Sequence, residues 1–468
     1  MTKVTPDYPK LVMPKNKLMR QLIKPWLFLK SRNCSIAMIT EGAYRMPLCE
    51  IRLPTRTTLF PLEPETVRRV LIEEWEQFPK STMVSDVLEL LMGDSIFVSN
   101  GDIWKRQRRM MDPAFEHARV KVVFDMMLDA AKAMNARLDR VADGRAVNVE
   151  EEMTFVTADI IFRTIFSRPL TVDEAGIIFK AFHVYQEAAF AHGLYRVIRL
   201  PRWATALNFR KAKSSARAIR NILDPIVKAR YDSFHSGAPQ THNDILQSLV
   251  SVKDEVTGTH FDLRELCEQV SMLFLAGHET SASALSWGLH LLSLDQAVQQ
   301  RMHDEARAVF GGRDITFADL RKLGITRNVF AETLRLFPPV PFLPREATKT
   351  CPFRNKTAEK GTIVSISPWM LQRHRAHWQN PDAFDPDRFD RPETREAERN
   401  CYIPFSKGPR VCLGASFALQ EATIILSALA SRYRFEPKPG FTPRVVGRLT
   451  LRSEAGIWLN VSRRPDPH

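Results

Sequence analysis

One cysteine near the end of the chain stands among residues that suit a metal-bound thiolate. The sequence FSKGPRVCLG places Cys412 between Gly408 and Gly414, whereas a cysteine used only for packing is usually an inert buried hydrophobe. The residues after Cys412 follow a helical pattern, so we expect the thiol at a helix N-terminus, where partial positive charge favours the thiolate. Gly414 would let backbone N–H groups approach the sulfur, Arg410 would add positive charge, and Phe405 would exclude water.

The number of cysteines limits which metal centre this thiolate could serve. The chain has 6 cysteines and no CxxC pair, so zinc sites and iron–sulfur clusters, which use several thiolates, fit poorly. A single protein thiolate on iron is the haem–thiolate arrangement. Six cysteines in 468 residues also make a poor disulfide framework, which indicates a reducing, cytoplasmic setting.

A second group of candidate residues interrupts a long apolar segment. Residues 262–293 are apolar nearly all round, which predicts one long helix through the interior. Within it, the sequence AGHET contains Gly277, which weakens a helix, and Thr280, whose hydroxyl can bond back to a carbonyl, so we expect a bend or a widened turn. Glu279 is a carboxylate in apolar surroundings and needs a partner or a chemical role. The alternative is a salt-bridged helix residue beside an ordinary threonine.

Two further pairs have helical spacing. Glu332 and Arg335 are three residues apart, hence on one helix face, and Arg388 lies in the sequence FDPDRF. One carboxylate and two guanidinium groups can lock a helix to a loop by charge-assisted hydrogen bonds, although exposed pairs with this spacing are common. Trp104 and Arg108 are four residues apart on another predicted helix.

These motifs together resemble those of one family. FSKGPRVCLG matches the pattern FxxGxRxCxG at every fixed position, and in this the chain resembles the haem-binding signature of the cytochrome P450 monooxygenases. The other motifs occur in the order that the family requires. The resemblance implies a mainly α fold, with a large helical domain, a long central helix and small β-sheets. Pro409 in the cysteine loop and Gln372, where relatives often carry histidine, are departures that leave the expected chemistry intact.

The resemblance implies a role for each candidate residue. Cys412 would be the axial ligand of haem b, and Glu279 with Thr280 would form an acid–alcohol pair that delivers protons to dioxygen. Glu332, Arg335 and Arg388 would form a buried structural network. The residues that would bind the haem are Trp104, Arg108, Arg345, Phe405, Arg410 and Gly414. The residues that would line a largely apolar substrate pocket are Ala276, Ala284, Val340, Phe342, Thr450 and parts of 83–97.

The implied activity is the insertion of one oxygen atom from O2 into a lipophilic, fatty acid- or terpenoid-like substrate. Too few residues follow Cys412 for a flavin domain and no GxGxxG occurs, so NAD(P)H would act indirectly, through a separate ferredoxin or flavodoxin and its reductase. Such carriers are often acidic, which suits the net charge of +14. Nucleic acid is excluded as a partner because no nucleic-acid-binding motif is found. The candidate contacts for the carrier, with solvated surface residues as the alternative, are Lys105, Arg106, Arg109 and Lys407.

The remaining sequence must build the scaffold for these residues. Helical periodicity predicts helices over 122–138 and 151–166. Alternating patterns predict strands within 49–62 and 447–461, and residues 349–362 are typical of a turn between strands. Because no linker divides the chain, we expect a single domain over 1–468, in which 1–45 is a basic amphipathic lead-in.

The lead-in determines what can be expected of membranes. No stretch reaches the roughly 18 apolar residues of a spanning helix. Residues 14–30 are basic with apolar residues between the charges, so they would either pack on the fold, which we favour, or rest on a membrane surface as a peripheral contact.

Three other functions remain open at this point. The first is a peroxide-driven peroxygenase or a haem isomerase on the same fold, against which the pair Glu279 and Thr280 argues. The second is a haem-binding or gas-sensing protein without catalysis. The third is a helical scaffold without haem in which Cys412 is accidental, and this would require several coincidences in the right order.

Overall fold

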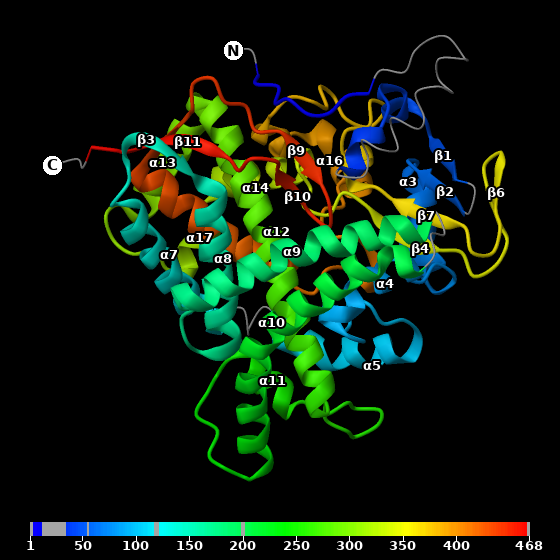
Figure 1. Ribbon diagram of the computed structural model, residues 1–468. Coiled ribbons are helices and arrows are strands. Elements are labelled where there is room, and N and C mark those ends of the chain that lie inside the picture. The colour runs from blue at the N-terminus through cyan, green and yellow to red at the C-terminus, as the bar shows by residue number, and fades with distance from the viewer. Residues whose placement is uncertain (1–2, 12–33, 54–55, 117–120, 198–201, 466–468) are drawn as a thin grey trace.

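Most of the chain is helical, and the longest buried helix runs through the middle of the molecule (Figure 1). The computed structural model describes residues 3–11, 34–53, 56–116, 121–197 and 202–465. The central helix is α12 (Leu263–Leu294), which is buried on nearly all sides, as its all-round apolar sequence predicts. The side chain of Asp262 accepts a hydrogen bond from the Glu265 N–H in a capping box that fixes where the helix begins.

The sequence AGHET lies within a continuous α-helix. Helical assignment is unbroken from Leu263 to Leu294, so of the two predicted alternatives the widened turn is wrong and the bend stays a prediction. The predicted back-bond is confirmed, because Thr280 Oγ1 donates to the Ala276 carbonyl at 2.8 Å. Gly277 has a packing role, since a Cβ there would lie 3.0 Å from Ile161 Cγ1 on helix α8 (Val149–Phe166). The glycine therefore allows α8 and α12 to approach closely.

The other helices surround α12. The predicted helices over 122–138 and 151–166 are present as α7 (Phe124–Leu138) and α8. The remaining α-helices are α3 (Pro64–Arg68), α4 (Thr82–Met92), α5 (Gly101–Met111), α9 (Val172–Val197), α10 (Arg202–His235), α11 (Ile245–Ser251), α13 (Gln296–Phe310), α14 (Gly324–Leu336), α15 (Pro368–Leu371), α16 (Arg395–Cys401) and α17 (Ala415–Arg432).

Small sheets lie at the sides of the helical body (Figure 1). In the four-stranded sheet, β1 (Leu48–Leu53) pairs antiparallel with β2 (Arg56–Pro61), which pairs parallel with β7 (Ile363–Ile366), and β7 pairs antiparallel with β4 (Leu343–Glu346). The strands predicted within 49–62 and 447–461 are present, and residues 349–362 connect β4 to β7 as predicted, but they form a short hairpin rather than a plain turn. The other sheets are β3 (Asp143–Asn148) with β11 (Trp458–Arg463) and β8 (Tyr433–Pro437), β9 (Val445–Gly447) with β10 (Leu451–Ser453), and the hairpin β5 (Cys351–Phe353) with β6 (Lys356–Ala358).

One cluster of buried apolar side chains extends from Tyr8 to Val461. This cluster is consistent with a single domain over residues 1–468, which stays a prediction. The start of the chain joins the core as an extended segment, in which the Val4 carbonyl accepts from Phe384 N–H at 2.8 Å and Tyr8 donates to Asp382 Oδ1 at 2.5 Å. The basic segment 14–30 lies outside the described residues. Among the described helices, none is both long enough and apolar enough to cross a bilayer.

Candidate active site

Cys412 lies in a tight loop before α17. The helix begins at Ala415, so the predicted position of the cysteine at a helix N-terminus is confirmed. The Cys412 N–H donates to the Phe405 carbonyl at 2.9 Å, which closes the loop. Gly408 has a φ of 73°, and a Cβ there would lie 2.2 Å from the Leu71 carbonyl oxygen. Only glycine fits that contact without a shift of the backbone.

The environment of the Cys412 sulfur differs from the expectation. Cys412 is exposed, yet the protein around the sulfur raises the pKa of its thiol, while the Gly414 N–H, as a donor, and the charge of Arg108 act to lower it. The positive charge thus comes from Arg108 rather than from Arg410. Because metal coordination deprotonates a thiol outright, the thiolate form depends on the metal more than on the helix N-terminus. Apart from Gly414 itself and its neighbours in the chain, no atom of the described residues lies within 4 Å of where a Gly414 Cβ would be.

Three cations gather beside Trp104. The Arg410 guanidinium lies 4.7 Å above the Trp104 ring and donates to Asn100 Oδ1 at 2.8 Å. Arg345 is buried, and burial followed by repulsion from Arg410 lowers its pKa to about 10. Burial, followed by repulsion from Arg410 and Arg345, also lowers the pKa of Lys80 well below its usual value. Lys80, Arg345 and Arg410 have no carboxylate partner among the described residues.

This cation cluster fits a bound anionic group. Cations in such surroundings are costly unless they are paired, and the two propionates of a haem would provide the missing negative charges. Arg108 is partly committed, because it forms an ion pair with Asp112 at 2.7 Å and donates to the Val411 carbonyl at 2.7 Å. The sequence motifs contained neither Lys80 nor Asn100. Lys80 donates to the carbonyls of Ile96 and Ser99, so it also holds the loop after α4.

Glu279 and Thr280 are neighbours on α12 but have different partners. Glu279 Oε1 accepts from Gln186 Nε2 at 2.7 Å and from Thr450 Oγ1 at 2.8 Å. Arg452, on β10, binds both carboxylate oxygens, with Nε 3.0 Å from Oε1. Burial acts to raise the pKa of Glu279, but the charge and hydrogen bonds of Arg452 outweigh it and lower the pKa to about 2. The structure therefore shows the salt-bridged carboxylate that the sequence left open as the alternative.

The predicted pocket residues come from three parts of the chain. Ala276, Thr280 and Ala284 follow one another at four-residue intervals along α12, which places them on one face. Val340 and Phe342 lie in the segment between α14 and β4. Residues 83–97 form most of α4 and the loop after it. The hydroxyl of Thr450 is bonded to Glu279, so it is not free to meet a substrate.

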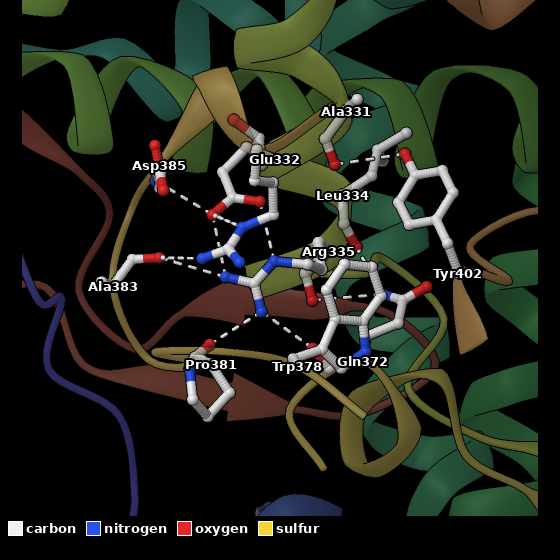
Figure 2. A network of polar contacts seen from close by, with 12 residues as sticks. Ala331, Glu332, Leu334, Arg335, Gln372, Trp378, Pro381, Ala383, Asp385 and Tyr402 are labelled. Carbon is white, nitrogen blue, oxygen red and sulfur yellow. Dashed lines mark hydrogen bonds and ion pairs between the residues drawn. The ribbon is translucent and has the colours of Figure 1, made fainter. Parts of the chain in front are cut away.

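The charged network around Glu332 has the predicted members and is fully buried (Figure 2). Arg335 donates twice to the Glu332 carboxylate, at 2.7 and 2.8 Å, and Arg388 Nε donates to Glu332 Oε1 at 3.0 Å. Arg335 Nη1 also reaches the carbonyls of Gln372 and Pro381 at 2.8 and 2.7 Å. The network thus ties α14 to the loop that precedes the cysteine segment.

Gln372, a departure from the family pattern, is a structural hub. Its Nε2 donates to the carbonyl of Leu334 at 2.8 Å, and its Oε1 accepts from the Ile403 N–H at 2.9 Å (Figure 2 shows the α14 side). The amide offers a donor and an acceptor at once, so it joins the end of α14 to the start of the loop that leads to Cys412.

Most of the predicted carrier contacts are already paired within the chain. Arg109 binds Asp254, whose side chain is fully buried, so this pair belongs to the fold. Lys407 donates to the Arg399 carbonyl. Of the four cations, Lys105 is the most available, since both side chains of its pair are well exposed. The ion pairs are Lys105–Glu76 at 2.7 Å, Arg106–Glu265 at 2.6 Å and Arg109–Asp254 at 2.9 Å.

Comparison with known proteins agrees with this fold. The family model described as cytochrome P450 matches residues 33–453, so the chain belongs to the cytochrome P450 family. It is a haem-thiolate monooxygenase of that family.

Two relatives and one solved structure give the range of similarity. Cyclooctatin synthase of Streptomyces melanosporofaciens is 32% identical over 404 residues, which cover 86% of each chain. Cyclooctat-9-en-7-ol 5-monooxygenase of the same organism is 31% identical over 398 residues, 84% of each chain. The crystal structure of the cytochrome P450DA haem domain has a TM-score of 0.80 and covers 99% of both chains at 23% identity, which shows the fold alone.

Proposed function

We propose that this P450 inserts one oxygen atom from O2 into a lipophilic, terpenoid- or fatty acid-like substrate. The observation that carries the proposal is the combination of Cys412 in a glycine-bearing loop with a cation cluster that has no carboxylate partner in the described part of the chain. Two relatives have names that refer to cyclooctatin and a cyclooctatenol. This favours a terpenoid-like substrate over a fatty acid.

The proposed roles follow from the contacts. Bound haem supplies the iron at which dioxygen is reduced, with Cys412 as its thiolate ligand. Lys80, Arg345 and Arg410 would bind the propionates. The ring of Trp104 would hold the Arg410 guanidinium in place by their cation–π contact. Phe405 and Gly414 would shape the space at the sulfur. Arg108, already paired with Asp112, would act mainly through its charge on the thiolate.

The proton-handling role is assigned to α12. The Thr280 hydroxyl donates its hydrogen bond to the Ala276 carbonyl, so its oxygen can still accept a hydrogen bond from an acid on the other side. Glu279 is the adjacent acid, but it is held as a carboxylate by Arg452. It must therefore acquire a proton before it can donate one. The remaining pocket residues supply apolar surface.

Electrons are proposed to come from NAD(P)H through a reductase and a separate ferredoxin or flavodoxin. With Arg106 and Arg109 committed to internal pairs, Lys105 is the surface cation that a carrier could recruit, because exposed ion pairs exchange at little cost. The rate of carrier-dependent reduction should fall with ionic strength. A rate that is independent of salt would reject electrostatic docking.

The first experiment is a carbon monoxide difference spectrum of the reduced protein. A Soret band at the red-shifted position of thiolate ligation supports Cys412 on iron, and Cys412→Ser should abolish it while the circular dichroism of the helices is kept. Spin-state shifts across a library of terpenoid alcohols and fatty acids then discriminate the two substrate classes. A band typical of histidine ligation, or no haem uptake, would overturn the proposed function.

A further inference from the structure

The guanidinium of Arg452 contacts two carboxylates. Besides Glu279, Arg452 Nη1 lies 3.4 Å from Glu150 Oε1, and it donates to Thr154 Oγ1 at 3.1 Å. Glu150 is the second residue of α8, and 9% of it is exposed. Elements that are far apart in sequence thus bring two acids to one cation: α8, α12 and β10.

The two acids are bound unequally. Glu279 has bonds to Arg452 through both oxygens and further donors in Gln186 and Thr450. Glu150 has only long contacts, to Arg452 at 3.4 Å and to the Ser453 N–H at 3.4 Å. When one cation serves two carboxylates, the better-bound one keeps the charge and the other holds the proton.

The electrostatic surroundings give the same order. Burial raises the pKa of Glu150, and the charge of Glu279 raises it further, although the charge of Arg452 acts to lower it. The pKa of Glu279, in contrast, is lowered to about 2. The remaining group that titrates here is His278, whose pKa burial lowers and whose Nε2 is 4.0 Å from Glu279 Oε2. His278 is therefore neutral at pH 7 and does not compete with Arg452 for the acids.

We propose that Glu150 stores the proton that Glu279 later delivers, and that Arg452 pairs with whichever acid is charged. The inference rests on the proposed proton-handling role of Glu279. In the transfer, the O–H bond of Glu150 breaks and an O–H bond forms on Glu279, while Arg452 moves its ion pair to Glu150. One carboxylate, one carboxylic acid and one guanidinium are present before and after.

Conservation of charge makes this exchange feasible in a buried site. Neither state leaves an unpaired charge, which is the costly situation in low dielectric. Glu279, once neutral and released from Arg452, can donate towards Thr280. Glu150, whose side chain is 12% exposed, can regain its proton from solvent. Two acids whose environments separate their pKa values are the usual arrangement for proton transfer in enzymes. Glu150 and Arg452 are positioning and relay residues, because no contact places them at the substrate.

The proton on Glu150 can be observed directly by infrared titration of the haem-loaded protein without substrate. Besides the band of Glu421, whose raised pKa keeps it protonated, we expect a second carboxylic-acid C=O band at pH 7 that Glu150→Gln removes. Glu152→Gln, on the same helix in an ion pair with Arg137, is the matched control and should remove none. In Glu279→Gln the negative charge that raises the pKa of Glu150 is absent. As the pH is raised, the Glu150 band should therefore disappear at a lower pH than in the unsubstituted protein. Acid bands unchanged by Glu150→Gln overturn the proposal.

Turnover with a ferredoxin, its reductase and NADPH, without added substrate, tests the transfer. Glu150→Gln should increase the peroxide released per NADPH severalfold and enlarge the solvent isotope effect. Glu150→Asp, which keeps an acid at this position, should bring both quantities part of the way back. Glu152→Gln should match the unsubstituted protein. If Glu279→Gln changes peroxide release but Glu150→Gln does not, the relay is wrong and the proposed function stands. If Glu279→Gln has no effect, the proposed role of Glu279 itself fails.

Discussion

Ser281 donates a hydrogen bond to Glu421, with 2.5 Å between Oγ and Oε2. The two residues join α12 to α17, the helices that carry Thr280 and follow Cys412. Glu421 is 1% exposed, and burial raises the pKa of its carboxyl to about 8, against the hydrogen bond from Ser281. The folded protein therefore holds a neutral carboxylic acid between these helices at pH 7.

The stability contributed by Glu421 should depend on pH. The folded pKa of about 8 lies above the ordinary value of 4.5, so the contribution is full below pH 4.5 and is lost as pH rises towards 8. Glu421→Gln, which cannot ionise, should gain stability relative to the unsubstituted protein between pH 5 and 9. Urea unfolding at pH 5, 7 and 9 measures this. The exposed Glu393→Gln serves as the control, and a stability difference that is constant with pH would contradict the assignment.

The network around Glu332 should dominate the stability of the region before the cysteine loop. Arg335→Ala leaves a fully buried carboxylate with Arg388 as its remaining cation, and loss of one partner of a buried pair costs about 3–5 kcal/mol. The comparison is Arg301→Ala, which breaks an exposed pair with Asp387 and should cost about 0–1 kcal/mol. The free energies of unfolding of the two variants in urea should differ accordingly, and equal losses would argue against a structural role.

Substitution of Gly408 should destabilise the protein more than substitution of other surface glycines. Gly408→Ala combines a φ of 73° with a Cβ placed 2.2 Å from the Leu71 carbonyl, and we expect a loss on the order of 1–3 kcal/mol. Gly312→Ala is the control, because no atom lies within 4 Å of its Cβ position. The melting temperature measures the loss of stability, and the haem content after purification measures the distortion of the cysteine loop. Both should fall in Gly408→Ala and stay unchanged in Gly312→Ala.

Thr280 should affect how oxygen is reduced, and a similar hydroxyl nearby should not. Thr280→Ala should raise peroxide release per NADPH and lower product yield. Ser286→Ala removes a hydroxyl with the same back-bond on the same helix, from Oγ to the Ala282 carbonyl at 2.7 Å, and should leave both quantities unchanged. Unchanged coupling in Thr280→Ala would remove the basis for its assigned role.

Periodicity and local spacing were sufficient for α7, α8 and α12 and for the pair Glu332 and Arg335, whereas Arg388 entered the predicted network only through the family resemblance. The pattern over 262–293 predicted α12 within one residue at each end, because burial on all sides leaves a continuous apolar run. The i,i+3 spacing likewise placed Glu332 and Arg335 on one face, and their burial is confirmed. Such features depend on neighbours within one helical turn.

Contacts between distant elements could not be predicted in this way. Arg452 reaches Glu279 from a short strand 173 residues away, and no spacing rule connects the two. Lys80 joins the cation cluster because its backbone forms a β-bridge with Arg345. Nothing in the sequence around either residue indicates that the two lie side by side. The widened turn at AGHET is absent, and the structural use of Gly277, the close packing of α12 on Ile161 of α8, is a contact between distant elements that the sequence could not show.

The attachment of the first residues has a consequence for synthesis of the chain on the ribosome. Tyr8 and Asp382 are separated by 374 positions, and at about 5–20 residues per second the ribosome needs roughly 20 to 75 s to make the second after the first. During that interval Val4 lacks Phe384 and Tyr8 lacks Asp382 and Trp369, although Tyr44, against which Tyr8 also packs, has already been made. The amino end is therefore open to chaperones and proteases until the segment that also anchors the Glu332 network has emerged.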